Sequence, residues 1–365
     1  MKGEREMGKF KPIRWSKRFA SLLAPYLHNK WLRLTGRLPK VKWVTWEITD
    51  ACNSRCQLCD IWKQKPSADM LTLDEVKKVF SDPLLKDLEM VLITGGEAAM
   101  RQDLLDIILF IHNKAPKAKF TISTNALLPD RVLKVTEAAL DAGADIFVGI
   151  SLDGIGAHHD EIRGVKGNYE KADYLLNKLL EMKKRYCERL GITIGQTIHP
   201  LTLNYIEEVE KYAKDKGVEY LAQLYDEAPY YHNIGKSNIK DAETERMIAL
   251  IGKMEPSFHN EVVMKILREK MIRFECYSMR SFFILKANGD VMPCLRLCGI
   301  KIGNVREHSP SAIWTGPEAE KARKLIADCK GCSNTWATDW SMQSSFLSFF
   351  PQLWSSFIKA RTGRK

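Results

Sequence analysis

The sequence predicts an α/β protein in which a parallel sheet curls into a partial (β/α)6 TIM-like barrel. Six β-branched, apolar runs alternate with segments of helical period, and such repeated units build a parallel sheet with helices outside it. Polar and cysteine-rich motifs fall at the carboxyl ends of these strands, where barrels bind ligands. The predicted strands are residues 42–49, 89–94, 118–123, 145–151, 191–198 and 219–225. The predicted helices are residues 73–81, 101–114, 130–142, 168–190 and 204–216.

Composition restricts the class of protein. A chain of 365 residues with 45% hydrophobic content can form one large domain, alone or with a small partner. We expect a cytoplasmic protein, because the sequence shows neither a signal peptide nor an apolar run of about 18 residues. In a reducing cytoplasm, clustered cysteines indicate metal binding more often than disulfides.

Positive charge is concentrated at the two ends. Residues 1–40 carry a net charge of +9 and residues 341–365 carry +4, so the remaining residues sum to −2. This distribution argues against nucleic acid as a partner of the body, and it favours an anionic surface that meets the ends. Residues 10–38 and the aromatic stretch within 341–365 are basic and amphipathic, which is typical of segments at a membrane interface. The alternative is that both ends pack on the barrel.

The first cysteine group follows the first predicted strand. Cys52, Cys56 and Cys59 have C-x3-C-x2-C spacing, and thiolates are the ligands that hold iron–sulfur clusters. Three thiolates leave one iron of a [4Fe-4S] cluster open to a small molecule. A zinc knuckle or buried structural thiols are the alternatives, but structural zinc needs four ligands.

Four further strand ends carry groups suited to a ligand. Gly95 and Gly96 allow close backbone approach, and Glu97 can accept a hydrogen bond from an ammonium group. Arg163 can pair bidentately with a carboxylate, or it makes a surface salt bridge. The short polar residues suited to ribose hydroxyls or a carboxylate are Ser123, Asn125 and Ser151. Tyr230 follows the sixth strand and either faces substrate or packs internally.

The second cysteine group lies near the end of the chain. Asn288-Gly289 between two apolar runs predicts a β-hairpin that brings Cys276 and Cys294 together. A predicted helix near 317–327 precedes a C-x2-C pair. The predicted ligands of one metal centre are Cys276, Cys294, Cys329 and Cys332, with Cys298 as a surplus thiol that could replace one of them. Zinc on the same four thiols remains an alternative.

The spacing of Cys52, Cys56 and Cys59 resembles that of the radical S-adenosylmethionine (SAM) superfamily, in which the open iron binds the amino and carboxylate groups of SAM. In this resemblance, Gly95-Gly96-Glu97 is similar to the turn that holds the SAM amino group, with Ala98 where proline is usual. The resemblance implies that Ser151 and Arg163 reach the SAM carboxylate. It also places Leu58, with Trp62 nearby, where the family often has an aromatic residue against adenine.

The second group resembles the shortened twitch form of the SPASM extension, which implies an auxiliary [4Fe-4S] cluster. Leu295 stands where the sulfatase-oxidising members carry an aspartate, which argues against carrying over their proton abstraction. The implied organisation is an N-terminal segment (1–41), a radical SAM core (42–226), a helical connector (227–275), an auxiliary cluster domain (276–340) and a C-terminal tail (341–365).

The resemblance implies an enzyme that reductively cleaves SAM and uses the 5′-deoxyadenosyl radical to abstract hydrogen from an unactivated carbon. The basic ends predict a lipid or lipid-linked substrate at the cytoplasmic face of a membrane. The alternatives are a ribosomal-peptide maturase, an oxidase of a sugar-like alcohol, and a non-catalytic iron–sulfur or zinc module. The implied protein partner is an electron donor such as flavodoxin or ferredoxin.

Overall fold

The computed structural model describes residues 27–28, 31–32, 34–38, 40–67, 69–237, 239–254, 257–272, 274–297, 299–329, 332–335 and 341. The predictions for most of the N-terminal segment, for Cys298 and for the tail after residue 341 lie outside the described residues. The membrane contact predicted from the two ends therefore stays a prediction. No described helix is both long enough and apolar enough to cross a membrane.

The described strands form one nine-stranded sheet in the order β6-β5-β4-β3-β2-β1-β7-β8-β9. Its first six strands are parallel, and each lies within one residue of its predicted bounds. They are β1 (Trp43–Thr49), β2 (Met90–Gly95), β3 (Lys119–Thr124), β4 (Asp145–Ser151), β5 (Leu190–Ile198) and β6 (Glu219–Leu224). The predicted α/β fold with a partial barrel is confirmed.

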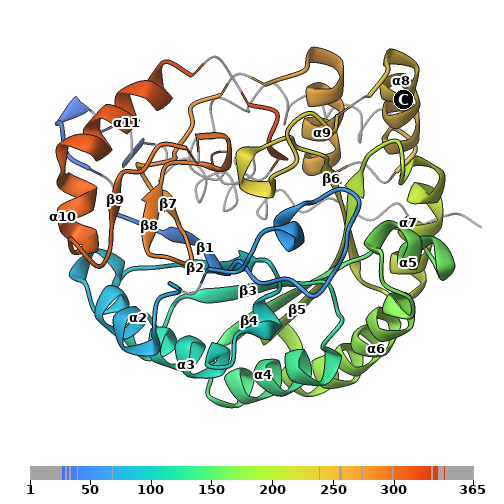
Figure 1. The fold of residues 1–365 in the computed structure, drawn as a ribbon, viewed down its shortest axis with the longest axis horizontal. Helices are drawn as coiled ribbons and strands as arrows, with labels where there is room; N and C mark the ends of the chain where they lie inside the picture. The colour runs from blue at the N-terminus through green and yellow to red at the C-terminus, as the bar shows by residue number, and fades with distance from the viewer. Residues whose placement is uncertain are drawn as a thin grey trace, which may run out of the picture.

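The helices after these strands form an arc on the outside of the curled sheet (Figure 1). They are α2 (Leu73–Phe80), α3 (Leu104–Lys114), α4 (Pro129–Asp141), α6 (Asn168–Tyr186) and α7 (Ile206–Asp215). Helix α5 (Ala157–Arg163) is absent from the predicted elements, because seven residues are too few to show a helical period. Short 3-10 turns occur at Ile61–Lys63, Pro83–Leu85, Ala98–Met100, Cys187–Arg189, Leu203–Tyr205, Pro229–Tyr231 and Leu295–Leu297.

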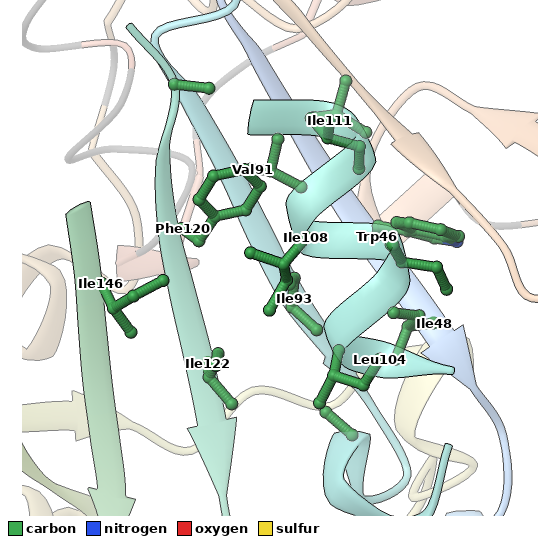
Figure 2. Close-up of a cluster of buried hydrophobic side chains, with 14 of the residues drawn as sticks. Trp46, Ile48, Val91, Ile93, Leu104, Ile108, Ile111, Phe120, Ile122 and Ile146 are labelled. Atoms are coloured by element: carbon green, nitrogen blue, oxygen red, sulfur yellow. The ribbon is translucent and has the colours of Figure 1, made fainter. Parts of the chain in front are cut away.

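Alternation along the strands separates the helix-facing core from the inside of the barrel. Trp46 and Ile48 of β1 are fully buried and lie beside Leu104 and Ile108 of α3 (Figure 2). Because successive side chains of a strand point to opposite faces, Glu47 between them faces the inside. Strand β1 therefore contributes apolar packing on one face and a carboxyl group on the other.

The C-terminal extension continues the barrel sheet. Strand β7 (Phe282–Leu285) pairs in parallel with β1, and β8 (Asp290–Met292) and β9 (Gly303–Asn304) follow in antiparallel order. The predicted hairpin is present, with Gly289 at a φ of +87° in its turn. Helices α10 (Pro310–Thr315) and α11 (Pro317–Ala327) follow. Through the pairing of β7 with β1, the sheet joins the barrel to the extension. The predicted domain boundaries stay predictions.

The segment between the barrel and the extension is helical, as predicted. Helices α8 (Asp241–Ile251) and α9 (Phe258–Glu269) pack together beside β6 through a separate small core. Met247, Ile251 and Val263 are buried in that core. These helices therefore cover the edge of the sheet that β6 forms among the described strands.

Candidate functional site

The first cysteine loop is fastened to the end of α5. The backbone N–H groups of Arg55 and Gln57 donate to the carbonyl oxygens of Arg163 and Ile162, both at 3.0 Å. These carbonyls belong to the last turn of a helix, where no helical partner is available. Gly164 has a φ of +66°, and a Cβ there would lie 2.5 Å from the Arg55 carbonyl oxygen, so only glycine fits. The helix that sequence patterns miss is what positions the loop.

Side-chain donors of the chain lie against two of the three loop thiols. The Asn125 Nδ2 atom lies 3.9 Å from the Cys52 sulfur, and the Arg163 Nη1 atom lies 3.7 Å from the Cys56 sulfur. The Ser54 hydroxyl lies 3.0 Å from the same Cys56 sulfur. Such donors favour thiolates and the sulfurs of a cluster. The arrangement fits the predicted iron–sulfur site in its donor chemistry.

Burial acts in the opposite direction on these thiols. It raises the pKa of Cys59 to about 12 and also raises the pKa of Cys52, with the neighbouring thiols adding to both shifts. A bound cation reverses this preference, because a coordinated thiol is deprotonated. In the part of the chain that the structure describes, no three His, Cys, Asp or Glu side chains are already grouped to hold a metal ion. The assignment of Cys52, Cys56 and Cys59 as ligands stays a prediction.

Gly95 and Gly96 bring the end of β2 against the end of β1. The Gly96 N–H donates to the Thr49 carbonyl at 2.7 Å, and a Cβ on Gly96 would lie 2.0 Å from the Ala51 carbonyl oxygen. Gly95 has a φ of +130°, and its Cβ would lie 2.1 Å from the Thr49 oxygen. The close approach that these glycines allow in the structure is to the chain itself. Their predicted approach to SAM stays a prediction.

Glu97 ties the end of β2 to the end of β3. Its carboxylate is buried and accepts three hydrogen bonds: from Ala99 N at 3.1 Å, Thr124 Oγ1 at 2.9 Å and Asn125 N at 2.7 Å. Burial raises its pKa, and these donors oppose that shift. The predicted contact with the SAM ammonium stays a prediction, and it would have to share a carboxylate that already has three donors.

Asn125 connects β3 to the cysteine loop. Its Nδ2 atom donates to Asn53 Oδ1 at 2.8 Å, and its carbonyl accepts from Asn168 Nδ2 at 2.8 Å. Both Asn53 and Asn168 are contacts that sequence reasoning missed. Their signal was weak, because an asparagine in a loop or at the start of a helix is common for local reasons.

Small polar residues line the inside of the barrel. Strand register places Thr94 opposite Glu47, and Ser123 of β3 opposite Gly149 of β4. Gly149 in turn lies opposite Thr193 of β5. Further along the same strands, Ser151 is paired with Gly195. These residues are half-buried except for Glu47, so the inner face is polar and has little side-chain bulk at these positions. The roles of Ser123, Asn125 and Ser151 toward SAM stay predictions.

Arg163 lies between the cysteine loop and the end of β4. Its Nε atom forms a buried ion pair with Asp153 Oδ2 at 2.8 Å, and Asp153 Oδ1 accepts from Thr197 N at 2.9 Å. The Asp153 N–H donates to His159 Nδ1 at 3.1 Å. Burial lowers the pKa of His159 to about 4, so its ring is neutral at pH 7. The salt bridge of the alternative is present, but it does not lie at the surface: its two side chains are 12% and 3% exposed. Contact with the SAM carboxylate stays a prediction.

Leu58 belongs to the cysteine loop, and Trp62 belongs to the 3-10 turn that follows it. The Leu58 side chain is buried, and its carbonyl accepts from Asn233 Nδ2 at 3.4 Å. The Trp62 indole N–H donates to the Cys56 carbonyl at 3.2 Å. Their predicted positions against adenine stay predictions.

The fold also brings the second cysteine group together. Burial raises the pKa of Cys294 to about 11 and that of Cys332 to about 12, and the charge of Cys276 adds to both shifts. The charge of Cys329 likewise adds to the burial-driven rise in the pKa of Cys276. Backbone hydrogen bonds of 2.9 Å in both directions join Cys332 to Ile272. These thiols influence one another electrostatically, and their assignment as ligands of one centre stays a prediction.

One connecting segment contacts both cysteine groups. The Tyr231 carbonyl accepts from Asp60 N at 3.0 Å, beside Cys59. Asp226, five residues earlier, accepts from Asn334 Nδ2 at 2.8 Å, next to the Cys332 loop. Tyr230 is buried among apolar side chains of the hairpin and of the first loop, which supports the packing alternative for this tyrosine.

Glu47 is a buried carboxyl group that sequence reasoning missed. Burial raises its pKa to about 7. The Lys286 Nζ atom of the extension lies 3.9 Å away and opposes the shift. A carboxyl group within an apolar strand would have been the signal for it. At pH 7 this group on the inner face can both give and accept a proton.

The open parallel barrel carries a three-thiol loop at its carboxyl edge and a second thiol group in the C-terminal extension. This arrangement fits the class of iron–sulfur enzymes that cleave SAM. Comparison with known proteins agrees with that class. Residues 46–201 match the Radical SAM superfamily, and residues 276–333 match SPASM, an iron–sulfur cluster-binding domain. The chain belongs to the radical SAM superfamily, in its SPASM/twitch branch, and is a radical SAM enzyme.

Two curated relatives match most of the chain. The pre-heme d1 synthase of Dinoroseobacter shibae is 26% identical over 341 residues, which span 80% of this chain and 79% of the relative. The Fe-coproporphyrin III synthase of Methanosarcina barkeri is 25% identical over 313 residues, which span 74% and 73%. Family membership implies a SAM-binding [4Fe-4S] cluster, an auxiliary iron–sulfur cluster and SAM itself.

Solved structures share the fold. Streptococcus suis SuiB bound to SAM has a TM-score of 0.61 at 16% identity, covering 82% of this chain and 75% of SuiB. The structure of anSMEcpe with bound AdoMet has a TM-score of 0.60 at 17% identity, covering 87% and 98%. At these identities the likeness concerns the fold alone.

Proposed function

We propose that this enzyme cleaves SAM reductively at the Cys52, Cys56 and Cys59 loop and abstracts a hydrogen atom from an unactivated carbon of a substrate inside the open barrel. The observation that carries the proposal is the fixation of this loop at the carboxyl edge of the sheet, by Asn125 on one side and Arg163 on the other. When bound, the cluster supplies the electron that cleaves SAM.

The residues of the chain position the reactants and exclude water. Arg163 has little exposure and is fixed by Asp153, so it offers a pre-oriented guanidinium group to a carboxylate at the loop. Tyr230, Ile284 and Met292 form an apolar wall against the loop. Such a wall excludes water from the site and prevents side reactions of the radical.

We propose a tetrapyrrole as the substrate class. Two relatives that match about three quarters of both chains are named as synthases of pre-heme d1 and of Fe-coproporphyrin III. Small residues such as Gly149 and Gly195 on the inner face are compatible with a wide, planar ring. A lipid is the second candidate, and it is favoured by the basic, amphipathic sequences at the two ends.

The test is product analysis after anaerobic reconstitution with iron and sulfide. The enzyme is incubated with SAM, dithionite and either Fe-coproporphyrin III or a total lipid extract, and 5′-deoxyadenosine and methionine are measured by mass spectrometry. We expect 5′-deoxyadenosine to rise with the tetrapyrrole and the tetrapyrrole to change in mass. The variant with Cys52, Cys56 and Cys59 all replaced by Ala is the matched control and should form none.

Two failures can be told apart. If wild-type protein with two reconstituted clusters forms no 5′-deoxyadenosine with any candidate, the proposed chemistry is wrong. If it cleaves SAM without altering the tetrapyrrole, the chemistry stands and Fe-coproporphyrin III is not the substrate. If the lipid extract stimulates SAM cleavage and one of its lipids is converted, a lipid becomes the proposed substrate.

A further inference from the structure

His199 lies directly after strand β5, at the carboxyl edge where barrels of this kind bind ligands. Gly195 and Thr197 belong to the inner face of β5, and the same alternation places His199 on that face. The centre of its ring lies 4.7 Å from that of Tyr225, which follows β6, and the two rings meet edge to face. His199 is therefore a polar side chain at the ligand end of the barrel, and sequence reasoning missed it.

One ring nitrogen of His199 is already used within the chain. The Leu201 N–H donates to Nδ1 at 3.2 Å, so Nδ1 holds a lone pair. Burial lowers the pKa of His199, whereas the charges of Glu243 and Asp153 oppose that shift. The ring is therefore neutral at pH 7. A neutral imidazole with its lone pair on Nδ1 has its hydrogen on Nε2.

The second ring nitrogen of His199 has no such use. Nε2 is buried and has no hydrogen-bond partner among the described residues, and His199 as a whole is 8% exposed. The carboxylates whose charges reach the ring have donors of their own: Asp153 pairs with Arg163 at 2.8 Å, and Glu243 accepts from the backbone N–H of Lys240 at 2.8 Å. Because buried donors usually have an acceptor, the unused N–H indicates that a ligand supplies one.

We infer that the Nε2–H group of His199 donates a hydrogen bond to a carboxylate arm of the bound substrate. The inference rests on the proposed function, which places a tetrapyrrole inside the barrel. Coproporphyrin-type tetrapyrroles have carboxylate arms, and a carboxylate accepts a stronger hydrogen bond than an uncharged oxygen does. A neutral donor suits a buried edge, because only one charge then has to leave water.

Two substitutions of His199 separate the roles of its two nitrogens. Asn places an oxygen near the position of Nδ1, so His199→Asn keeps an acceptor for the Leu201 N–H and loses the donor. Gln places an N–H group near the position of Nε2, so His199→Gln keeps the donor and loses the local acceptor. His199→Gln is therefore the matched control for His199→Asn.

The experiment titrates Fe-coproporphyrin III into the anaerobically reconstituted protein and follows the absorbance of the tetrapyrrole. We expect His199→Asn to bind it about tenfold or more weakly than the wild type, and His199→Gln to bind it within about threefold of the wild type. The tetramethyl ester of Fe-coproporphyrin III has no charged acceptor. The difference between the wild type and His199→Asn should therefore shrink to about twofold or less with the ester. SAM affinity should be the same in all three proteins.

Three results would overturn the inference. The first is equal binding of Fe-coproporphyrin III by the wild type and His199→Asn, which would mean that the donor finds a weak acceptor within the chain, such as the face of the Tyr225 ring. The second is an equal loss with the ester, which would mean that the ring only packs. The third is a loss of SAM affinity in His199→Asn, which would assign the donor to SAM. Should His199→Asn fail to fold, equal wild-type affinity for the acid and the ester would still refute the carboxylate contact.

The failure of this inference differs from the failure of the proposed function. If the wild type converts Fe-coproporphyrin III and His199→Asn binds it equally well, the proposed function stands and the role of His199 is wrong. If the wild type does not bind Fe-coproporphyrin III, that compound is not the substrate, and the contact inferred for His199 is wrong with it. Formation of 5′-deoxyadenosine tests the SAM chemistry separately in either case.

Discussion

The two cysteine groups of this protein are built in different ways. Cys52, Cys56 and Cys59 lie on one loop, which local hydrogen bonds to the end of α5 and to Asn125 hold in place. The second group spans Cys276 to Cys332 and needs a hairpin, the end of α11 and a backbone pairing at Ile272 to assemble. The first site therefore depends on a few contacts near one strand end, whereas the second depends on the packing of the whole extension.

The largest expected effect is the loss of iron and of SAM cleavage when the thiols of each cysteine group are removed. Of about eight irons per reconstituted chain, replacing Cys52, Cys56 and Cys59 by Ala should remove about half and abolish SAM cleavage. Replacing Cys276, Cys294, Cys329 and Cys332 by Ala should remove the other half and leave the first cluster detectable by electron paramagnetic resonance. Iron analysis and 5′-deoxyadenosine assays measure both effects. SAM cleavage that survives the first substitution would contradict the assignment.

Each region also contains an arginine with little exposure, and the two can be compared directly. Arg163 pairs with Asp153 beside the first group, whereas Arg323 of α11 donates from Nε to the Met279 carbonyl at 2.7 Å beside the second. Arg163→Ala leaves the buried Asp153 carboxylate without its cation and should lower the free energy of unfolding by about 3–5 kcal/mol. It should also weaken SAM binding, measured by equilibrium titration. Arg323→Ala should destabilise the protein while leaving SAM affinity unchanged, and equal SAM affinities in the two variants would refute the distinction.

Glu97 tests how far the first site depends on its own hydrogen bonds. Glu97→Gln keeps the shape of the side chain but replaces one accepting oxygen with an N–H donor, which faces the Asn125 N–H or the pair formed by Ala99 N and Thr124 Oγ1. One or more buried donors then lose their acceptor, which should cost about 1–3 kcal/mol of unfolding free energy. Chemical denaturation measures this cost. A variant as stable as the wild type would show that the carboxylate serves a ligand rather than the fold.

The smallest expected effect compares two carboxylates that join the barrel to the extension. Burial raises the pKa of Glu47 to about 7, whereas hydrogen bonding to Arg306 lowers the pKa of Glu75 to about 2. Between pH 4.5 and 7, unfolded Glu47 loses a proton that the folded state keeps, so this group makes stability fall as pH rises through that window. Glu75 acts oppositely: its contribution is present above pH 4.5 and is lost as pH falls toward 2.

The test measures unfolding free energies at pH 5 and pH 8. Glu47→Gln should lose about 1–3 kcal/mol less stability over this range than the wild type. Glu75→Gln should be less stable than the wild type at both pH values, since Glu75 is ionised at both. If Glu47→Gln follows the wild-type pH dependence, Glu47 titrates near its ordinary value and is not the proton-exchanging group of the inner face.

The sequence by itself determined the parts of this protein that depend on short-range patterns. The apolar, β-branched run of residues 42–49 and the helical period within 101–114 predict barrel units, because each pattern is typical of one kind of buried element. The C-x3-C-x2-C spacing predicts the first site because its three thiols cannot be far apart on one short loop. Asn288-Gly289 predicts the hairpin because this pair suits the backbone of its turn.

The tertiary structure alone decided which distant groups meet. Nothing in the local sequence places β7 beside β1, pairs Arg163 with Asp153, or uses Gly96 to admit the Ala51 carbonyl. Glu97 shows the same limit, since its sequence context indicates a ligand contact and the fold supplies three donors from β3 and its own turn. The physical reason is that hydrogen bonds and ion pairs of buried polar groups depend on distance in space. Local patterns record only whether a side chain is buried, and the partner that satisfies it is chosen when the elements pack.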